Sequence, residues 1–382
     1  MKNPSLLLLC LGLWLSTCSR INPPGKKPTV LVSQKGLDSP LQHIRLPAGF
    51  HIELYAEDVP NARSIALSPA GTMYVGTRKE GSVYALQDRD GDGKMDQRHL
   101  LARDLWMPNG VAYRDGDLYV AEVNRVLKFP QIEQRLESPG EPEVLYDQYP
   151  DKSHHGWKYI AFGPDGKLYI PVGAPCNICE SEDIFNTITR MNPDGTGMEI
   201  VHRGIRNTVG FTWHPQTKEL WFTDNGRDWM GDDMPACELN HASQDDLHFG
   251  YPYCHQGDTP DPEFGSKRNC TEFTAPIQKI TPHAAPLGLE FYRPGNFPAR
   301  FADCVFIAEH GSWNREKKSG YRVTMVRLQD GKAVSYEPFA EGWLLPEDEV
   351  WGRPVDLEWL PDGSLLVSDD FANAVYRIYY TG

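Results

Sequence analysis

The sequence predicts an all-β protein, a six-bladed β-propeller, because one type of hairpin recurs six times along the chain. Each copy has alternating apolar residues, a tight turn supplied by Pro-x-Gly or Asp-Gly, and a second alternating run that ends in small and polar residues. Successive copies lie 46, 49, 51, 78 and 68 residues apart. A hairpin that repeats every ~40–50 residues is typical of a propeller with one blade per copy. The copies begin at Ser64, Gly110, Tyr159, Gly210, Gly288 and Asp356.

The segment before the first hairpin is expected to close the ring. Residues 50–55 alternate between apolar and polar, while the last copy supplies three evident strands that end near residue 378. Pairing the first segment with the last blade would remove two exposed sheet edges. Residues 225–286 and 312–353 are long segments without a periodicity of their own, which predicts functional loops. No helical period extends beyond a turn or two.

The first 18 residues are predicted to be a secretory signal of the lipoprotein type. The charged start, Met1-Lys2, is followed by an apolar run from Leu6 to Leu15, which is too short for a bilayer core that needs ~20 residues. The run ends in Leu-Ser-Thr-Cys, which resembles a lipobox with Cys18 as the lipid acceptor; ordinary cleavage nearby is the alternative. Residues 19–40 would be a tether and residues 41–382 the propeller domain. We therefore expect the periplasm or the outer membrane, with membrane contact only through a lipid on Cys18.

The charge of the chain argues against nucleic acid as a partner. The formal net charge is −14, the acidic residues are spread widely, and the sequence has no basic stripe or base-stacking motif. An acidic balance of this kind favours solubility and cation sites instead.

Six cysteines remain after the predicted signal, an even number that favours disulfides in an exported chain. Six cysteines permit fifteen pairings, and the sequence does not choose among them. We expect Cys254 and Cys270 to be bonded, since they lie in one Gly- and Pro-rich excursion without a core of its own. The pairs left over are Cys176 with Cys179 and Cys237 with Cys304.

Residues 88–96, DRDGDGKMD, resemble a calcium-binding loop. Carboxylates at loop positions 1, 3, 5 and 9, with glycine at position 6 for the bend, suit a hard cation such as Ca²⁺. The acidic residue of an EF-hand at position 12 is replaced by His99, so a solvated acidic turn is the alternative. We predict a structural, non-catalytic Ca²⁺ bound by Asp88, Asp90, Asp92 and Asp96.

Polar and charged residues recur where the predicted blades begin and end. His155 precedes the third hairpin, and a histidine there suits a general base because its ordinary pKa is near neutrality. Arg206 and Asn207 precede the fourth, where a cation and an amide could bind a carboxylate or an oxyanion. Structural roles, a hydrogen-bonded loop histidine and a bracing arginine, are the alternatives. Other such segments are residues 223–233, 309–315, 351–353 and 369–370.

The ordered motifs of the chain resemble those of the sorbosone dehydrogenase family, relatives of the soluble quinoprotein glucose dehydrogenases. The likeness covers residues 46–379 and implies a six-bladed propeller, in agreement with the hairpin count, with pyrroloquinoline quinone (PQQ) and Ca²⁺ as cofactors. The motifs are HHGWKYIAFGPDGKLYIPVG, CNIC, ITRMNPDGTG, GIRN, LWFTDNGRDWMGDD, ELN, FGYPYC and AEHGSWNR.

The resemblance also implies roles for individual residues. His155 falls on the base that removes the hydroxyl proton as hydride leaves for the quinone. Arg206 and Asn207 fall on cofactor contacts, with Arg206 placed to stabilise the oxyanion on the reduced quinone. The backbone carbonyls of Gly226 and Arg227 fall on the site of the cofactor-bound Ca²⁺.

Later positions match the family less closely. Arg353 and Asp370 fall on contacts with cofactor or substrate. Pro108 stands where the glucose enzymes have a substrate-contacting Gln, and Cys237 stands where an acidic ligand is expected. Asp232 or Asp233 could substitute for that acid, and Arg315 or Lys317 for the cofactor-binding Lys.

We therefore expect an oxidoreductase that uses PQQ to oxidise a sugar or a related alcohol. The sequence does not distinguish a quinone from a cytochrome as the electron acceptor. A Ca²⁺-dependent lactonase of similar propeller shape and a non-catalytic binding propeller on the cell surface are the alternatives. The dehydrogenase predicts that His155, Arg206 and the backbone carbonyls of Gly226 and Arg227 line one cleft at the axial mouth. The binding propeller predicts that His155 and Arg206 do not face one shared cleft.

Overall fold

The computed structural model describes residues 40–382, and every structural statement below refers to this part of the chain. The predicted signal, residues 1–18, lies outside the described residues, as does all but the last residue of the predicted tether, residues 19–40. Within residues 40–382, no helix is long and apolar enough to cross a bilayer.

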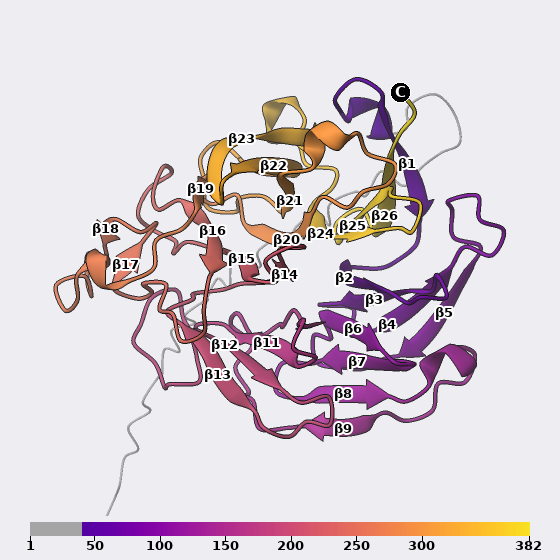
Figure 1. Ribbon diagram of the computed structural model, residues 1–382, viewed down its shortest axis with the longest axis horizontal. Helices are drawn as coiled ribbons and strands as arrows, with labels where there is room; N and C mark the ends of the chain where they lie inside the picture. Colours follow the sequence, from indigo (N-terminus) through magenta and orange to yellow (C-terminus); the bar gives the residue numbers. More distant parts are fainter. Residues whose placement is uncertain (1–39) are drawn as a thin grey trace, which may run out of the picture. The chain divides into compact units, whose positions relative to one another are not determined.

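Six four-stranded antiparallel sheets follow one another round a ring in chain order (Figure 1). Each predicted hairpin supplies the first two strands of one sheet, so the prediction of a six-bladed propeller is confirmed. First strands of neighbouring blades contact one another and are therefore the innermost. Blades 1 to 3 consist of β2 (Ala62–Leu67), β3 (Met73–Thr77), β4 (Val83–Gln87) and β5 (Gln97–Ala102); β6 (Gly110–Arg114), β7 (Asp117–Ala121), β8 (Val126–Phe129) and β9 (Glu143–Tyr146); and β10 (Ala161–Phe162), β11 (Leu168–Val172), β12 (Thr187–Met191) and β13 (Glu199–Arg203).

The second half of the ring has the longer connections. A two-stranded hairpin and five short 3-10 helices lie outside the six sheets of the described chain. Blades 4 to 6 consist of β14 (Phe211–Trp213), β15 (Leu220–Asp224), β16 (Cys237–Ala242) and β19 (Gln278–Ile280); β20 (Pro286–Phe291), β21 (Cys304–Glu309), β22 (Arg322–Gln329) and β23 (Lys332–Glu341); and β24 (Pro354–Trp359), β25 (Leu365–Asp369), β26 (Ala374–Tyr380) and β1 (Phe50–Ala56). The hairpin is β17 (Cys254–His255) with β18 (Thr259–Pro260), and the helices are η1 (Pro40–His43), η2 (Ile132–Gln134), η3 (Cys270–Glu272), η4 (Ala299–Phe301) and η5 (Pro346–Asp348).

The N-terminal strand closes the ring as predicted. β1 pairs antiparallel with β26, with Phe50 opposite Tyr380 and Leu54 opposite Tyr376. The last blade therefore takes its fourth strand from the start of the domain. This pairing covers the outer edge of β26, and β1 becomes the outermost strand of the last blade.

The two long segments are not loops throughout, which corrects the prediction made for them. Residues 225–286 contain the third and fourth strands of blade 4, together with the small hairpin β17–β18. Residues 312–353 contain β22 and β23 of blade 5, which have eight and ten residues and are the longest strands of the described chain. β22 is buried along most of its length and β23 is half-exposed, so neither has the simple alternation that would have revealed it.

The core lies between the blades rather than within one layer. Each pair of neighbouring blades shares a cluster of buried apolar side chains, as Tyr74 and Leu127 illustrate for blades 1 and 2. At the axis the inner strands approach so closely that side chains are excluded. A Cβ atom on Gly210 would lie 2.1 Å from the Leu287 carbonyl oxygen, and one on Gly110 would lie 2.5 Å from that of Lys158. Glycine at the start of an inner strand is therefore a packing requirement.

Two of the three expected disulfides are present. Cys254 is bonded to Cys270 and Cys176 to Cys179. The pairing of Cys237 with Cys304 is wrong, because both are free and buried. Cys237 belongs to the apolar cluster between blades 4 and 5, and Cys304 to the one between blades 5 and 6. Blade 5 therefore separates the two thiols.

Candidate functional site

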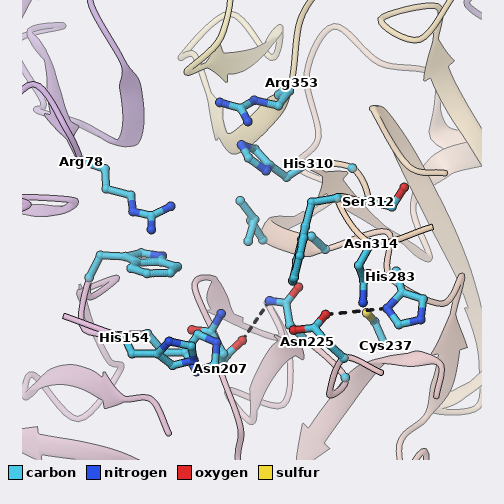
Figure 2. Close-up of a pocket in the computed structure, with 18 of the residues that line it drawn as sticks. Arg78, His154, Asn207, Asn225, Cys237, His283, His310, Ser312, Asn314 and Arg353 are labelled. Atoms are coloured by element: carbon cyan, nitrogen blue, oxygen red, sulfur yellow. Dashed lines mark hydrogen bonds and ion pairs between the residues drawn. The ribbon is translucent and has the colours of Figure 1, made fainter. Parts of the chain in front are cut away.

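A cavity of about 590 Å³ opens where the connections between blades converge at one end of the axis. Figure 2 shows His310 and Arg353 across this cavity from His154 and Asn207. Every lining residue comes from a connection or from the end of a strand. The lining consists of Arg63, Arg78, Met107, Ser153, His154, His155, Trp157, Asn207, Asn225, Gly226, Asp228, Cys237, His283, Ala285, Leu287, His310, Gly311, Ser312, Trp313, Asn314, Tyr321 and Arg353.

One side of the cavity, the histidine wall, is formed by His154, His155 and Asn207, which precede blades 3 and 4. His155 is held with a φ of 50°, and its Nδ1 lies 3.0 Å from the carbonyl oxygen of Ala174. A carbonyl only accepts, so Nδ1 carries the proton and Nε2 presents its lone pair. Burial, the positive charge of Arg206 and the neighbouring His154 hold the pKa of His155 well below its ordinary value. The ring is therefore neutral near pH 7 and able to accept a proton.

Arg206 lies directly behind this wall and not in it, contrary to the prediction that it lines the cleft. Its guanidinium donates from Nε to the Asn177 carbonyl at 2.9 Å and from Nη2 to the Asn177 side chain at 2.8 Å. Nη2 also lies 3.3 Å from a carboxylate oxygen of Asp228. The backbone carbonyl of Arg206 accepts from the amide of Ala174, the residue that orients His155. These partners satisfy the guanidinium and turn it away from the cavity.

A buried carboxylate shapes the turn that presents Asn207. Asp224, at the end of β15, accepts the backbone N–H of Arg206 at 2.8 Å and that of Asn207 at 2.7 Å. The Asn225 side chain donates to the Asn207 carbonyl at 2.9 Å. Burial raises the pKa of Asp224 to about 6, although these backbone donors favour its charged form. The blade 4 connection is thus fixed by hydrogen bonds across the start and end of one hairpin.

The opposite side, the charged wall, is formed by Arg63, His310 and Arg353 with Asp370 behind them. One oxygen of Asp370 lies 3.1 Å from Arg63 Nη1; the other lies 2.9 Å from His310 Nε2 and 3.0 Å from Arg353 Nη2. Burial alone would raise the pKa of Asp370, but its three partners hold it well below the usual range. Burial lowers the pKa of His310 to about 4, so this histidine is neutral and donates from Nε2. The wall keeps two arginines for one carboxylate.

Arg78 adds a third cation between the two walls. Its guanidinium carbon lies 3.5 Å from the centre of the Trp157 ring, a cation–π contact. Burial, followed by the nearby charge of Arg63, lowers the pKa of Arg78 to about 10. Among the described residues, the buried Nε atoms of Arg78 and Arg353, Nε1 of Trp157 and Oδ1 of Asn314 have no hydrogen-bond partner. Unpaired polar atoms of this kind are costly unless a ligand satisfies them.

The predicted calcium ligands divide between the cavity and its surroundings. Gly226 lines the cavity, but the Arg227 side chain turns away to an ion pair with Asp261 at 2.6 Å. Asp232 and Asp233 do not line the cavity, and neither does Arg315; these three residues contact one another instead. Their assignment to cofactor or metal is therefore not supported by position. The cavity lining contains Asp228, which the sequence motif included without a role.

The acidic loop of blade 1 keeps three of its four predicted ligands together. Carboxylate oxygens of Asp88, Asp90 and Asp96 lie within 4.8 Å of one another. Asp92 is not part of this group, because its carboxylate turns back to accept the amide of Lys94 at 2.8 Å. The loop lies outside the cavity lining, consistent with a structural and not a catalytic assignment.

The sequence reasoning missed several lining residues, and the repeat itself contained a signal for some of them. The missed residues Arg78, Asn225 and His310 each follow directly after the second strand of their blade, as does Asp370, which was predicted and lies behind the lining. Aligning the hairpins by strand end would have placed Arg78 in the same ring as the other three. No sequence signal marks Arg63, which lies inside β2 and reaches the cavity only because the inner strand ends there.

Comparison with known proteins finds one matching family and several relatives. Residues 44–381 match the family described as TrAA12-like. A Borreliella burgdorferi relative described as an uncharacterized protein is 31% identical over 352 residues, which cover 88% of this chain and 91% of that protein. The pyrroloquinoline quinone-dependent pyranose dehydrogenase of Coprinopsis cinerea is 34% identical over 122 residues, which are 27% of this chain and 16% of that protein.

Solved structures with the same fold are more distant in sequence. The Trichoderma reesei protein of Carbohydrate-Active Enzymes Family AA12 superposes with a TM-score of 0.77 at 20% identity, covering 91% of this chain and all of that one. The PQQ domain of the Coprinopsis cinerea pyranose dehydrogenase gives 0.74 at 18% identity, covering 88% and 97%. The soluble aldose sugar dehydrogenase of Escherichia coli gives 0.67 at 17%, covering 87% and 100%. These matches agree with the six-bladed propeller described above.

Proposed function

The chain belongs to the TrAA12-like family, and we propose that it is a quinoprotein dehydrogenase that oxidises a sugar or a related alcohol with PQQ and Ca²⁺ in the axial cavity. The names of its relatives support sugar oxidation and PQQ. The observation that carries the proposal is the cavity itself, which combines a neutral, oriented histidine with a surplus of arginines.

The residues of the cavity fit a planar molecule with several carboxylates, as PQQ is. Its volume of about 590 Å³ lies within the ~300–1,000 Å³ of most ligand pockets. Arg63, Arg78 and Arg353 face the cavity, and Asp370 pairs with Arg63 and Arg353 but not with Arg78, so an anionic ligand would restore charge balance. The unpaired Nε atoms of Arg78 and Arg353 would donate to it. For Ca²⁺, Gly226 and Asp228 are the candidate oxygen donors in the wall.

When bound, PQQ supplies the acceptor for the hydride that leaves the substrate carbon. The protein supplies the base: Nε2 of His155 takes the proton of the hydroxyl group, and Nδ1–H to the Ala174 carbonyl keeps the ring in that tautomer. Arg206 is a positioning residue, since it holds Ala174 through its carbonyl and residues 177 and 228 through its guanidinium. The buried setting excludes water around the base.

The two alternatives predicted from the sequence have less support. A calcium-dependent lactonase would need several carboxylates converging at the axis, and Asp228 contributes the one carboxylate among the described lining residues. A binding propeller gives no reason for a buried histidine whose tautomer is set by a backbone carbonyl. Arg206 does not line the cavity, as the binding propeller predicts, although Ala174 joins it to His155 through two hydrogen bonds.

Reconstitution tests the proposal. Purified protein should bind PQQ in the presence of Ca²⁺ with a dissociation constant measurable by calorimetry, and should then reduce an artificial electron acceptor with one or more aldoses, polyols or secondary alcohols. Arg353→Ala should weaken PQQ binding, and Arg135→Ala, outside the cavity, serves as the matched control. Failure to bind PQQ would contradict the cofactor assignment, and binding without turnover across the whole panel would contradict the dehydrogenase assignment.

A further inference from the structure

Two indoles stand at the rim of the cavity and are almost uncovered. Trp229 is 68% exposed and Trp313 is 70% exposed, the two most exposed large apolar side chains in the described part of the chain. Their ring centroids lie 5.4 Å apart with an interplanar angle of 88°. Trp313 lines the cavity, and Trp229 follows Asp228, which also lines it. The pair is therefore continuous with the cavity.

The fold does not require these indoles. Neither belongs to the apolar clusters that join the blades. Trp229 has a φ of 70°, a left-handed conformation that a bulky residue rarely adopts. Backbone strain of this kind is concentrated at functional sites, where the surroundings hold the residue in place. An exposed, strained tryptophan beside a cavity points to a ligand.

The loops that carry the two indoles are locked together. Arg315, in the blade 5 loop, donates to the carbonyl of Asp232 in the blade 4 loop at 2.8 Å. The amide of Glu316 donates to the Asp232 carboxylate at 3.1 Å, and Arg315 also lies 3.4 Å from Asp233. These contacts fix the indole pair before any ligand arrives, which reduces the entropy cost of binding. They also give Arg315, Asp232 and Asp233 a role outside the cofactor site.

The size and chemistry of the pair favour a sugar ring over a protein partner. The surface of two side chains is far smaller than the ~800 Å² that each partner buries in a stable protein interface. The axial C–H groups of a pyranose present an apolar face that stacks on an aromatic ring, while its hydroxyl groups remain in water. We propose that Trp229 and Trp313 form a subsite for a second sugar ring, next to the ring that enters the cavity.

The preferred ligand is accordingly an oligosaccharide or the end of a glycan chain, rather than a free monosaccharide. The part of this inference that concerns which ring is oxidised rests on the proposed function, whereas the binding of a second ring does not. A ring beyond the cavity adds contact area without disturbing the reacting one. Its expected effect is on affinity for longer chains, and not on the chemistry.

Calorimetric titration of the purified protein without PQQ tests the subsite. The probes are cellotetraose, xylotetraose and chitotetraose, each compared with its monosaccharide. At least one tetrasaccharide should bind about tenfold more tightly than its monosaccharide, and Trp229→Ala should remove that gain. Trp106→Ala, which deletes another partly exposed indole outside the cavity lining, should leave it intact. The inference is overturned if no tetrasaccharide binds more tightly, or if Trp229→Ala binds it as the parent protein does.

A second variant separates binding from folding. Glycine accepts a positive φ without strain, so Trp229→Gly should leave the unfolding midpoint unchanged or raise it while still removing the tetrasaccharide gain. A lower unfolding midpoint together with lost tetrasaccharide binding would instead make Trp229 a structural residue and contradict the subsite.

Activity assays keep the two proposals apart. Loss of tetrasaccharide binding in Trp229→Ala, in a protein that oxidises no sugar with PQQ, would retain the subsite and reject the dehydrogenase. Oxidation of monosaccharides, with tetrasaccharide binding unchanged in the variant, would do the reverse.

Discussion

The two walls of the cavity differ in charge and in the groups that hold their side chains. The histidine wall is neutral: the backbone carbonyl of Ala174 orients the His155 ring, and the Asn225 side chain donates to the backbone carbonyl of Asn207. The charged wall is held by ion pairs from Arg63, His310 and Arg353 to Asp370. The Ala174 carbonyl fixes the direction and tautomer of the His155 ring, whereas the ion pairs fix the charge of Asp370 and its arginine partners. One wall is thus suited to moving a proton and the other to binding an anion.

The same perturbation serves opposite purposes in the two walls. Burial lowers the pKa of His155 and of His310, so both rings are neutral. Neutrality makes His155 a proton acceptor through its free Nε2, but it makes His310 a donor to a carboxylate that two arginines already stabilise. A lowered pKa therefore does not identify a catalytic histidine. The partner of the other ring nitrogen does.

The largest expected effect breaks the histidine wall. Replacing His155 with Ala should reduce turnover by ~10²–10⁴-fold while PQQ affinity changes little, because general base catalysis contributes an effect of that size. Turnover of the parent protein should stay flat as the pH falls from about 8 to about 6.5, since the lowered pKa keeps His155 neutral there. Steady-state kinetics over this range would measure both effects.

His154→Ala is the matched control, because it deletes the neighbouring ring, whose centroid lies 4.1 Å from that of His155. A much smaller loss is expected there. Equal losses in the two variants, or normal turnover in His155→Ala, would contradict the assignment of the base.

The second effect breaks the charged wall. Asp370→Asn leaves the buried Arg63 and the half-buried Arg353 without a counter-charge, and removing one partner of a buried ion pair such as Arg63–Asp370 costs ~3–5 kcal/mol. Because the pKa of Asp370 is lowered on folding, its contribution to stability is present above the unfolded pKa of ~3.9 and is lost as the pH falls through the folded value. Denaturant unfolding at neutral pH would measure the loss.

Asp246→Asn, in an exposed pair with Arg203, should cost far less by the same measurement. Similar losses of unfolding free energy for the two substitutions would show that the ion pairs of Asp370 stabilise the fold no more than an exposed pair does.

The smallest expected effect concerns the Cys176–Cys179 disulfide loop, which lies behind the histidine wall. Replacing both Cys176 and Cys179 with Ser removes the disulfide that closes the loop around Asn177. Asn177 accepts hydrogen bonds from the Arg206 guanidinium and none from the charged wall. We expect a loss of about 2 kcal/mol in unfolding free energy, the value for a short disulfide loop. Turnover should fall severalfold with unchanged PQQ binding, as stopped assays and calorimetry would measure.

The matching double substitution at Cys254 and Cys270 should lower stability without altering turnover, because that disulfide lies away from the cavity lining. If turnover changed in this control and not in the Cys176 and Cys179 variant, the role of the Cys176–Cys179 loop in positioning Arg206 would be contradicted.

Local patterns predicted much of this molecule. Six hairpins, the closing strand at residues 50–55 and the Cys254–Cys270 bond are confirmed, and each depends on alternation, turns or a short loop that one stretch of chain carries by itself. The position of His155 in the wall was also predictable, because it directly precedes an inner strand. The propensities of neighbouring residues were sufficient for these features.

Side-chain direction was not predictable in the same way. Arg206 turns behind the wall because Asn177 and Asp228 from other blades bind it, and Arg315 turns outward because Asp232 does. Cys237 and Cys304 stay reduced because a whole blade lies between them. Each outcome depends on groups far away in the sequence.

The sequence by itself therefore determined the number of blades, the closure of the ring and which chain segments reach the axis. Tertiary structure alone decided which charged side chains face the cavity and which face each other. The physical reason is that strand pairing follows from short-range alternation and turns, while a buried charge takes the orientation in which its nearest opposite charge or hydrogen-bond partner lies. In this protein those partners come from different blades, as Asp370 of blade 6 and Arg63 of blade 1 do across 307 residues.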